Sequence, residues 1–520
     1  MRRDYFKHNW QVLLLNFIVI LCFILFYGKF GSIFVDSFRE AYIPEQILNG
    51  EILYKNIFCI YAPFAYLFNA FLFKIFGINL NILYFLGLIS SLLIVNLAYI
   101  IGRKFLPQLY TFAALLFTIS VLIISPTLFN TIFPYSFGMV YGLIFALFSI
   151  YFALNKKFPL SYLMYSFAIA SKYEFLLLLP ALIFISRKND IFKNLISLII
   201  PQILVFLPLF FMGLGFSDLT NELELLADIS STKTMHYYYY ISGLIFSPKL
   251  LLFYTANFIK ILLPIILLVK FRNVYTIFLT FLYLYIFIKP EIFIYLIPLI
   301  LILLIIKFKK LSLNKRFFCL SSILVSAKMF FAYVIKSYGV YYTPLLLISL
   351  FILLSRSVKK SLLVILLLST FIFASQNVSE LLDKNYKIST NRGTVFVTSD
   401  MGDSISKLNK YILSDTLKGD KVLLLPEMTS VNFLTNRGCD NKLYSLIPMY
   451  VEAFSEDAII SRLKNKKIEY IIITNFDSSD YYYSFFGKDY GVNITKYIKD
   501  NYDEINEFIG DSLFKVYKLR

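Results

Sequence analysis

Histidine, cysteine and tryptophan are scarce in this sequence of 520 residues, which contains two histidines, four cysteines and one tryptophan. Two histidines are too few for a metal site built from histidine. The cysteines are far apart and form no Cys-x-x-Cys pair, so their spacing indicates neither a zinc site nor a disulfide framework. They are Cys22, Cys59, Cys319 and Cys439.

Acidic residues are also in the minority. The 32 aspartates and glutamates stand against 50 lysines and arginines, which leaves a formal net charge of +18. A charge of this size is common in proteins that bind nucleic acid. Here, however, the basic residues lie at the ends of long apolar runs, as in the cytoplasmic loops of membrane proteins. We therefore expect a lipid bilayer, and no nucleic acid, as the partner of this charge.

Apolar residues make up 59% of the chain, and its mean hydropathy is +0.72. Soluble domains contain about 45–50% apolar residues. Because a helix needs about 20 apolar residues to cross a bilayer, the apolar runs predict a polytopic α-helical membrane protein with about 13 transmembrane helices. The runs lie at about 11–27, 79–101, 108–125, 137–154, 158–170, 174–186, 194–213, 250–269, 275–288, 291–306, 317–334, 340–355 and 361–375.

The distribution of charge predicts the orientation of these spans. The first run follows Arg2, Arg3 and Lys7 but has no small-residue cleavage site after it, so we expect a retained anchor with a cytoplasmic N-terminus. Later basic clusters then fall on the cytoplasmic side, while acidic residues collect in the outer loops. An odd number of spans places everything after Ser375 outside the cytoplasm.

Two consecutive runs, 158–170 and 174–186, are too short to cross a bilayer of about 30 Å alone. They either merge into one span or form two half-length helices that meet at Ser171–Tyr173. Merging would move all later basic clusters outside, so parity favours two helices.

The tail, residues 376–520, is expected to form a separate extracytoplasmic α/β domain after a transmembrane domain of residues 1–375. Its candidate strands are Val422–Leu425, Tyr470–Thr474 and Leu513–Tyr517, with amphipathic helices near Ser404–Ser414 and Asp457–Lys464. No Gly-rich phosphate loop, G-x-S-x-G or G-x-G-x-x-G motif accompanies them.

The first outer loop, about residues 31–78, contains the most informative acidic residues. Asp36 and Glu40 are four residues apart, so on a helix they would share one face. Two neighbouring carboxylates raise each other's proton affinity and can act as a general base, a metal ligand or an orienting group. A simpler interpretation is a solvated acidic loop that follows the charge rule.

The pattern of this loop resembles that of the GT-C glycosyltransferases. A short first span is followed by Asp36 and a nearby acid, then by Gly50–Lys55 and by Tyr61–Tyr66. The similarity is to the family-39, protein-mannosyltransferase-like branch that includes bacterial aminoarabinose and galacturonic acid transferases. It covers about residues 5–375 by architecture. The family's usual Tyr-Gly-Pro is Tyr-Ala-Pro here, with Ala62 in place of glycine.

The resemblance implies roles for several residues of the loop. Asp36 corresponds to the acid that deprotonates or orients the acceptor, and Glu40 to a supporting acid. Arg39 and Tyr61 become candidate substrate contacts. No cofactor is implied, and a divalent metal at Asp36 and Glu40 is left open, because two carboxylates without a third ligand do not establish such a site.

Two lysines are candidates for binding the donor phosphate. Lys172 lies where the two short runs meet, and in the resembling family a lysine at this place contacts the phosphate; the alternative is an interfacial pair of Lys172 with Glu174. Lys328 is expected in the outer part of a span, where ionisable groups are costly. Related sequences often have arginine there, and snorkelling to the interface is the simpler explanation. Tyr338 and Tyr341 are further candidate substrate contacts.

These patterns together predict an inverting GT-C glycosyltransferase of the plasma or inner membrane. Its donor would be a sugar on polyprenyl phosphate and its acceptor a cell-envelope glycan, lipid or protein on the extracytoplasmic side. A transporter or flippase for lipid-linked glycans is the alternative, as is a non-catalytic glycan-binding protein built around the tail. Transporters place polar groups near the midplane, whereas the candidate residues here collect at one face.

Overall fold

The computed structural model describes residues 2–186, 191–241, 244, 245, 247–271, 273–289, 293, 295–330 and 335–520. The chain divides into two compact units. The first, called the helical unit below, comprises Met1–Phe30, Phe85–Leu204 and Tyr240–Leu381. The second, called the mixed unit, comprises Gly31–Tyr84, Val205–Tyr239 and Leu382–Arg520. Each unit therefore combines segments that are far apart in the sequence.

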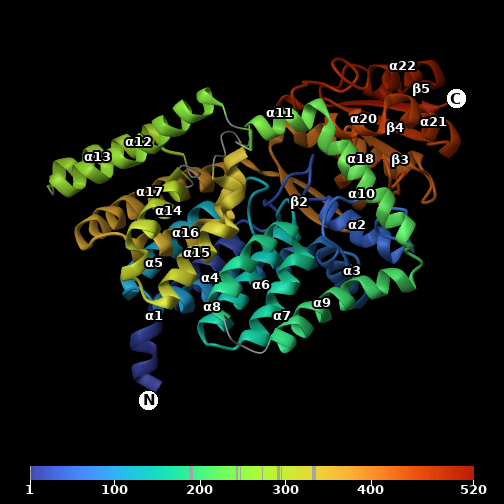
Figure 1. The fold of residues 1–520 in the computed structure, drawn as a ribbon. Helices are drawn as coiled ribbons and strands as arrows, with labels where there is room; N and C mark the ends of the chain where they lie inside the picture. Colours follow the sequence, from blue (N-terminus) through green and yellow to red (C-terminus); the bar gives the residue numbers. More distant parts are fainter. Residues whose placement is uncertain are drawn as a thin grey trace. The chain divides into compact units, whose positions relative to one another are not determined.

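The predicted apolar runs each contain a helix (Figure 1). The helices are α1 (Arg2–Leu25), α4 (Leu80–Arg103), α5 (Gln108–Thr118), α6 (Phe137–Leu154), α7 (Phe158–Ser171), α8 (Leu179–Ser186), α9 (Ile191–Phe211), α12 (Pro248–Lys270), α13 (Val274–Phe287), α14 (Ile297–Lys307), α15 (Leu313–Val325), α16 (Thr343–Leu353) and α17 (Arg356–Asp383). The start of the run at 291–306 and the end of the run at 317–334 lie outside the described residues.

Length and composition suit several of these helices to crossing a membrane. Among the described residues, five helical segments are long and apolar enough to do so, namely α4, α6, α9, Leu251–Lys270 of α12, and α17. Large apolar side chains such as Phe192 on α9 and Val274 on α13 are exposed, to 72% and 79%. Water-facing surfaces rarely carry so much apolar area, so these helices suit a lipid environment.

The chain breaks between α7 and α8. Helix α7 ends at Ser171, Lys172 is extended with φ −155° and ψ 121°, and a 3₁₀ turn follows at Tyr173–Leu178. The interpretation as two short helices is therefore confirmed. Gly138 of α6 permits this geometry, because a Cβ there would lie 2.5 Å from the main-chain oxygen of Ser171. Helices α6 and α7 consequently pack side by side, as Figure 1 shows.

The mixed unit contains short helices, a four-stranded sheet and a hairpin. Its helices are α2 (Arg39–Leu48), α3 (Phe64–Phe76), α10 (Phe216–Ser231), α11 (Lys233–Ile241), α18 (Ser399–Asp415), α19 (Thr429–Thr435), α20 (Pro448–Phe454), α21 (Glu456–Lys466) and α22 (Val492–Asn501). Its strands are β1 (Tyr386–Thr390), β2 (Gly393–Val397), β3 (Val422–Leu425), β4 (Tyr470–Thr474), β5 (Tyr502–Glu504) and β6 (Phe514–Leu519).

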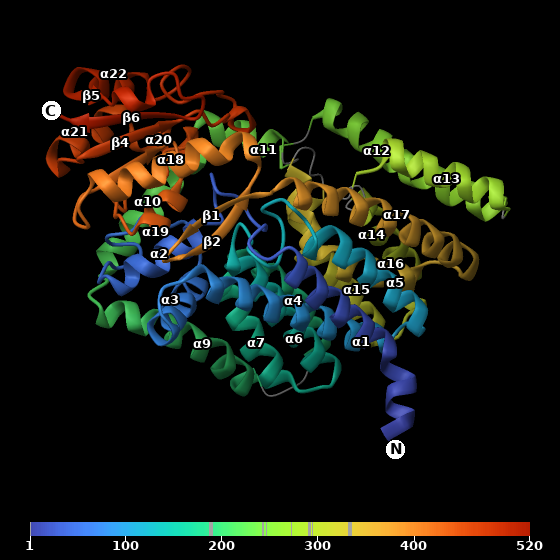
Figure 2. The same cartoon turned by 180° about the vertical axis from the view of Figure 1, so that it is seen from behind.

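The sheet has the order β3-β4-β6-β5. Figure 2 labels β4, β6 and β5 of this sheet, seen from the other side of the molecule. Strands β3 and β4 are parallel and fully buried, which explains their unbroken apolar sequences. The strands predicted at Val422–Leu425 and Tyr470–Thr474 have the predicted bounds, and the third is shifted to Phe514–Leu519. The two predicted helices lie inside α18 and α21. The β1–β2 hairpin and β5 were not predicted.

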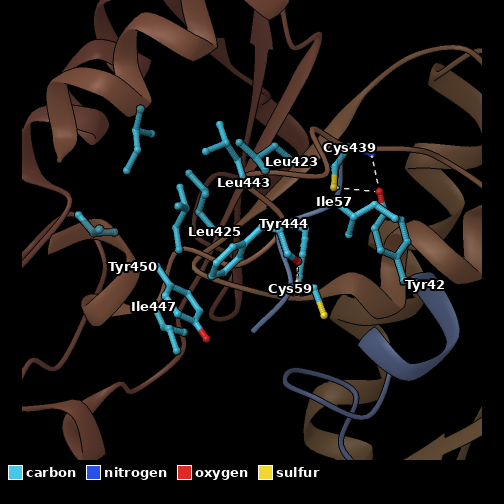
Figure 3. Packing of buried hydrophobic residues seen from close by; sticks show 14 of the residues in the cluster. Tyr42, Ile57, Cys59, Leu423, Leu425, Cys439, Leu443, Tyr444, Ile447 and Tyr450 are labelled. Carbon is cyan, nitrogen blue, oxygen red and sulfur yellow. Dashed lines mark hydrogen bonds between the residues drawn. The ribbon is translucent and has the colours of Figure 1, made fainter. Parts of the chain in front are cut away.

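The first loop shares a core with the tail. Tyr42 of α2 donates a hydrogen bond to Asn441 Oδ1 at 2.7 Å and accepts one from the main-chain N–H of Cys439 at 3.1 Å. Tyr444 donates to the main-chain oxygen of Phe58 at 3.0 Å. Figure 3 shows Tyr42 beside Cys439 in this packing. Residues nearly four hundred positions apart therefore depend on one another for burial.

Candidate functional site

Asp36 precedes helix α2 rather than lying on it. Its main-chain φ is +58°, a left-handed conformation that costs a non-glycine residue about 1 kcal/mol or more. The conformation is held from both ends: its N–H donates to Glu427 Oε1 at 3.1 Å, and its Oδ1 accepts from Arg39 Nη1 at 2.6 Å. The side chain remains 23% exposed. The expectation that Asp36 and Glu40 share one helix face is wrong, because α2 begins only at Arg39.

Glu40, in the first turn of α2, is fully buried. Its Oε1 accepts a hydrogen bond from the Tyr66 hydroxyl at 2.9 Å and lies 3.7 Å from Arg39 Nε. A buried carboxylate needs such partners, because its desolvation is otherwise very unfavourable. In this structure Glu40 therefore supports Arg39 and presents no surface to a substrate.

Arg39 connects the two acids to Tyr61. Its guanidinium carbon lies 4.3 Å from the centre of the Tyr61 ring, and the residue is only 4% exposed. Burial works to lower the pKa of Arg39, but Tyr61, Tyr66 and the two carboxylates outweigh it, so this pKa is raised and the charge is secure. Arg39 is thus a fixed cation that orients Asp36, and Tyr61 covers its face.

Glu427 belongs to this group although the sequence did not identify it. It follows strand β3, is 4% exposed, and accepts from Ser445 Oγ through its second oxygen, Oε2, at 2.8 Å. Burial raises the pKa of Glu427 to about 7, with a further contribution from the charge of Asp36, while Arg39 opposes both. An acid directly after a buried strand was the available signal, but only the fold shows that it reaches Asp36.

The charge arrangement bears on the question of a metal. The guanidinium of Arg39 already contacts both Asp36 and Glu40. Within the part of the chain that the structure describes, no three histidine, cysteine, aspartate or glutamate side chains gather in a way that could hold a metal ion. Arg39 is therefore the cation that these two carboxylates share here. Below, the term acidic network refers to Asp36, Arg39, Glu40, Tyr61 and Glu427.

The candidate lysines meet around aromatic rings in the helical unit. Lys172 Nζ donates to the Tyr135 hydroxyl at 3.0 Å and lies 4.8 Å from the centre of that ring. Lys328 Nζ lies 4.8 Å from the centre of the Tyr338 ring. The rings of Tyr135 and Tyr338 are themselves in edge contact, with centroids 4.9 Å apart. Two lysines separated by more than 150 residues thus share one aromatic platform.

Glu174 balances this pair. It forms an ion pair with Lys328 at 3.0 Å and accepts from the Tyr342 hydroxyl at 2.5 Å. The ion pair between Glu174 and Lys328 was not predicted from the sequence. Lys328 lies in the 3₁₀ turn Ala327–Met329, which follows the end of α15 at Val325. Its side chain is 35% exposed.

Tyr341 has a structural place in the same region. It is fully buried, and its hydroxyl donates to the main-chain oxygen of Asn130 at 2.9 Å. Its ring lies 5.9 Å from that of Tyr135. Tyr341 therefore supports the rings beneath the lysines, whereas Tyr338 is partly exposed and lies next to Lys328. Below, the term cation–tyrosine cluster refers to Tyr135, Lys172, Glu174, Lys328 and Tyr338.

The cation–tyrosine cluster can bind an anion. Two lysines against one glutamate leave a formal excess of positive charge, and lysine is a compact point charge suited to phosphate. The acidic network can accept a proton, because Asp36 is a partly exposed carboxylate at the edge of buried groups. The eight residues singled out from the sequence thus divide evenly, four in each unit.

No family model and no curated protein matches this sequence. Among solved structures, the chain is similar to ArnT from Cupriavidus metallidurans, whose crystal structure contains bound undecaprenyl phosphate. The alignment covers 98% of each chain, with 10% sequence identity and a TM-score of 0.42. At that identity and score the similarity carries no argument about this chain, whose function is inferred from its own residues.

Proposed function

We propose that this protein is a membrane glycosyltransferase of the GT-C type. It transfers a sugar from a polyprenyl-phosphate donor to a cell-envelope acceptor, and the reaction inverts the anomeric centre. The acceptor is a glycan, lipid or protein on the extracytoplasmic side of the plasma or inner membrane.

The observation that carries this proposal is the cation–tyrosine cluster. Lys172 and Lys328 come from different segments, and both are placed over tyrosine rings at breaks in apolar helices. A lipid phosphate has a charged group directly attached to a long apolar chain. A pair of cations set among apolar helices with exposed hydrophobic surfaces suits that combination of properties.

The acidic network supplies the base of the proposed reaction. An acceptor hydroxyl attacks the anomeric carbon, its proton passes to the Asp36 carboxylate, and the bond from that carbon to the phosphate oxygen breaks. Both electrons of that bond stay with the leaving polyprenyl phosphate, whose charge Lys172 and Lys328 stabilise. Fixed charges that meet a leaving group in place usually provide the larger part of such catalysis.

The proposed sidedness has its own test. We expect reporter fusions after Lys310 and Lys360 to be cytoplasmic, and fusions after Phe58, Ser230 and Arg520 to be outside. The reason is the concentration of basic residues on one set of loops. A cytoplasmic fusion after Arg520 would mean an even number of crossings and would put Lys328 on the wrong side for the proposed transfer.

The activity test uses the full-length protein purified in detergent and supplied with polyprenyl-phosphate sugars of several kinds. We expect transfer to an acceptor glycan or lipid, and donor binding that weakens in a Lys172→Ala/Lys328→Ala double variant. Movement of the intact donor across vesicles without any transfer would instead support a transporter. Donor binding that is unchanged in the double variant would remove the cation–tyrosine cluster from the donor site.

A further inference from the structure

A pocket lies wholly inside the mixed unit, and none of its lining residues belongs to the acidic network. It has a volume of about 450 Å³ and lies between the first loop, α10 and the segment that contains α20 and α21. That volume is within the range of about 300–1,000 Å³ usual for small-molecule sites. Lys55, Lys442 and Arg462 supply three basic side chains to its walls. Nothing in the proposed transfer chemistry uses these cations.

Two of the three basic side chains form ion pairs with acidic residues of the mixed unit. Arg462 binds Asp440 through two hydrogen bonds of 2.6 and 2.7 Å, and the Asp440 side chain is 3% exposed whereas that of Arg462 is 37% exposed. Lys442 lies 3.5 Å from Glu222, which is likewise buried. Each acid is thus more buried than its basic partner, and Glu222 lines the pocket together with Lys442.

Asp218 is the second acidic residue that lines the pocket, beside Glu222. Asp218 lies at the start of α10, where its Oδ2 accepts the main-chain N–H of Gly215 at 2.8 Å and caps the helix. Lys55 donates to the main-chain oxygen of Gly213 at 2.8 Å, which fixes this exposed lysine at the rim. The walls thus carry three basic and two acidic side chains, which leaves a formal excess of one positive charge among the lining residues.

The other walls suit a sugar rather than a bare ion. Phe454, Leu225 and Ile459 provide apolar surface, and Asn221 provides an amide that can both donate and accept. Sugar rings combine apolar C–H faces with hydroxyl groups of both kinds, and aromatic rings pack against those faces. A phosphate ion alone has no apolar surface that could pack against the apolar side chains of the pocket.

The pocket is connected to the acidic network by direct contacts. Tyr54 lines the pocket, and its hydroxyl donates to the main-chain oxygen of Tyr61 at 2.6 Å. The Tyr61 ring covers Arg39, which in turn holds Asp36. Lys442 donates to the main-chain oxygen of Tyr54 at 3.3 Å. The loop that positions the proposed base thus also forms a wall of the pocket.

We propose that this pocket binds a saccharide carrying a phosphate or carboxylate group. The statement that this saccharide is part of the acceptor rests on the proposed transferase function. The proposed binding of the saccharide does not depend on that function. Arg462 and Lys55 contact the anionic group, and Phe454 packs against the sugar ring. An acceptor held here is anchored on the same unit as Asp36.

Binding is measured by calorimetry on the full-length protein in detergent, with glucose 1-phosphate, glucuronate, glucose and inorganic phosphate as probes. We expect the two charged sugars to bind at least about tenfold more tightly than either glucose or phosphate alone. Arg462→Ala and Lys55→Ala should each weaken the charged sugars by about tenfold, and Phe454→Ala should weaken sugars but not phosphate. Lys464→Ala is the matched control, since this exposed lysine lies on the same helix, outside the pocket walls.

The possible outcomes test saccharide binding in the pocket separately from the proposed transferase activity. Equal affinity for phosphate and glucose 1-phosphate would reduce the pocket to a general anion site and overturn the saccharide assignment. Equal losses in Arg462→Ala and Lys464→Ala would overturn the pocket as the location. If loss of the Arg462–Asp440 pair unfolds the protein, Lys55→Ala still tests the pocket, because Lys55 is exposed. Binding as expected without any sugar transfer would leave the inference standing and refute the proposed function.

Discussion

The acidic network of the mixed unit and the cation–tyrosine cluster of the helical unit handle charge in opposite ways. In the acidic network, two of the three carboxylates are buried and only Asp36 is partly exposed. In the cation–tyrosine cluster, the lysines keep partial exposure and lie against tyrosine rings. A base benefits from one defined position, whereas a phosphate site benefits from accessible charge. This difference fits the proposed division of roles, with a base in the mixed unit and a phosphate site in the helical unit.

The cost of the two arrangements also differs. A buried carboxylate requires hydrogen-bond partners. Glu427 obtains them from Ser445 and the Asp36 N–H, and Glu40 accepts from Tyr66. A lysine over an aromatic ring keeps part of its hydration and gains about 0.5–2 kcal/mol from the ring. Changes in the acidic network should therefore affect stability and pH dependence, while changes in the lysines should mainly affect ligand binding.

The largest expected effect is that of Asp36→Asn. Asparagine keeps the size of the side chain but cannot take the proton of the acceptor, so transfer should fall by about 10²–10⁴-fold. Donor binding should stay near that of the wild type, because the proposed phosphate contacts are in the other unit. Transfer and donor binding are measured on the same purified preparations. Undiminished transfer would exclude Asp36 as the base, and loss of both would assign it to the shape of the loop.

Lys172→Ala should have the next largest effect. Loss of one charge-assisted contact to phosphate costs about 1.5–3 kcal/mol, which corresponds to a roughly ten- to hundredfold weaker donor. Lys172→Arg keeps the charge and should be milder, although it changes the hydrogen bond to Tyr135. Donor titrations of the three proteins provide the comparison. Equal affinities would make Lys172 a residue that only sets the depth of the helix.

Glu40→Gln should reduce stability more than chemistry. Glutamine can still accept from Tyr66, but Arg39 loses one of its two carboxylates. We expect a loss of about 1–3 kcal/mol in the free energy of unfolding, together with a smaller fall in transfer than for Asp36→Asn. Thermal unfolding of the purified variant tests this. A transfer defect equal to that of Asp36→Asn at unchanged stability would give Glu40 a direct chemical role.

The smallest expected effect is a change in pH dependence for Glu427→Gln. In the folded protein the pKa of Glu427 is raised from 4.5 to about 7, so between these values the folded state binds more protons than the unfolded state. The contribution of Glu427 to stability therefore falls as pH rises through this window. Glutamine keeps an oxygen for the Asp36 N–H but does not titrate.

Thermal unfolding of wild type and variant across pH 4.5–7 tests that prediction. The difference in stability between Glu427→Gln and wild type should become more favourable to the variant as the pH rises. Glu45, whose pKa burial also raises to about 7, titrates in both proteins and cancels in the comparison. Parallel curves would show that Glu427 keeps one protonation state throughout the window.

The sequence by itself predicted a helix in each apolar run and the strands at Val422–Leu425 and Tyr470–Thr474. The break at Ser171–Tyr173 was favoured by the parity of the spans, and the structure contains it. The helices and strands depend on hydrophobicity and on neighbours within a few residues, so local patterns are enough to predict them. The resemblance to the GT-C family identified Asp36 and Lys172 as candidates, and Lys328 was a candidate because an ionisable residue in the outer part of a span is costly.

Only the tertiary structure decided which of these residues act together. It joined the first loop to the tail in one core, brought Glu427 to the N–H of Asp36, and placed Lys172 and Lys328 on touching tyrosine rings. Asp36 and Glu427 are 391 positions apart, and no pattern within either segment encodes the other. Such pairs are set by the packing of whole segments, which bury polar groups only where a partner from elsewhere in the chain is supplied.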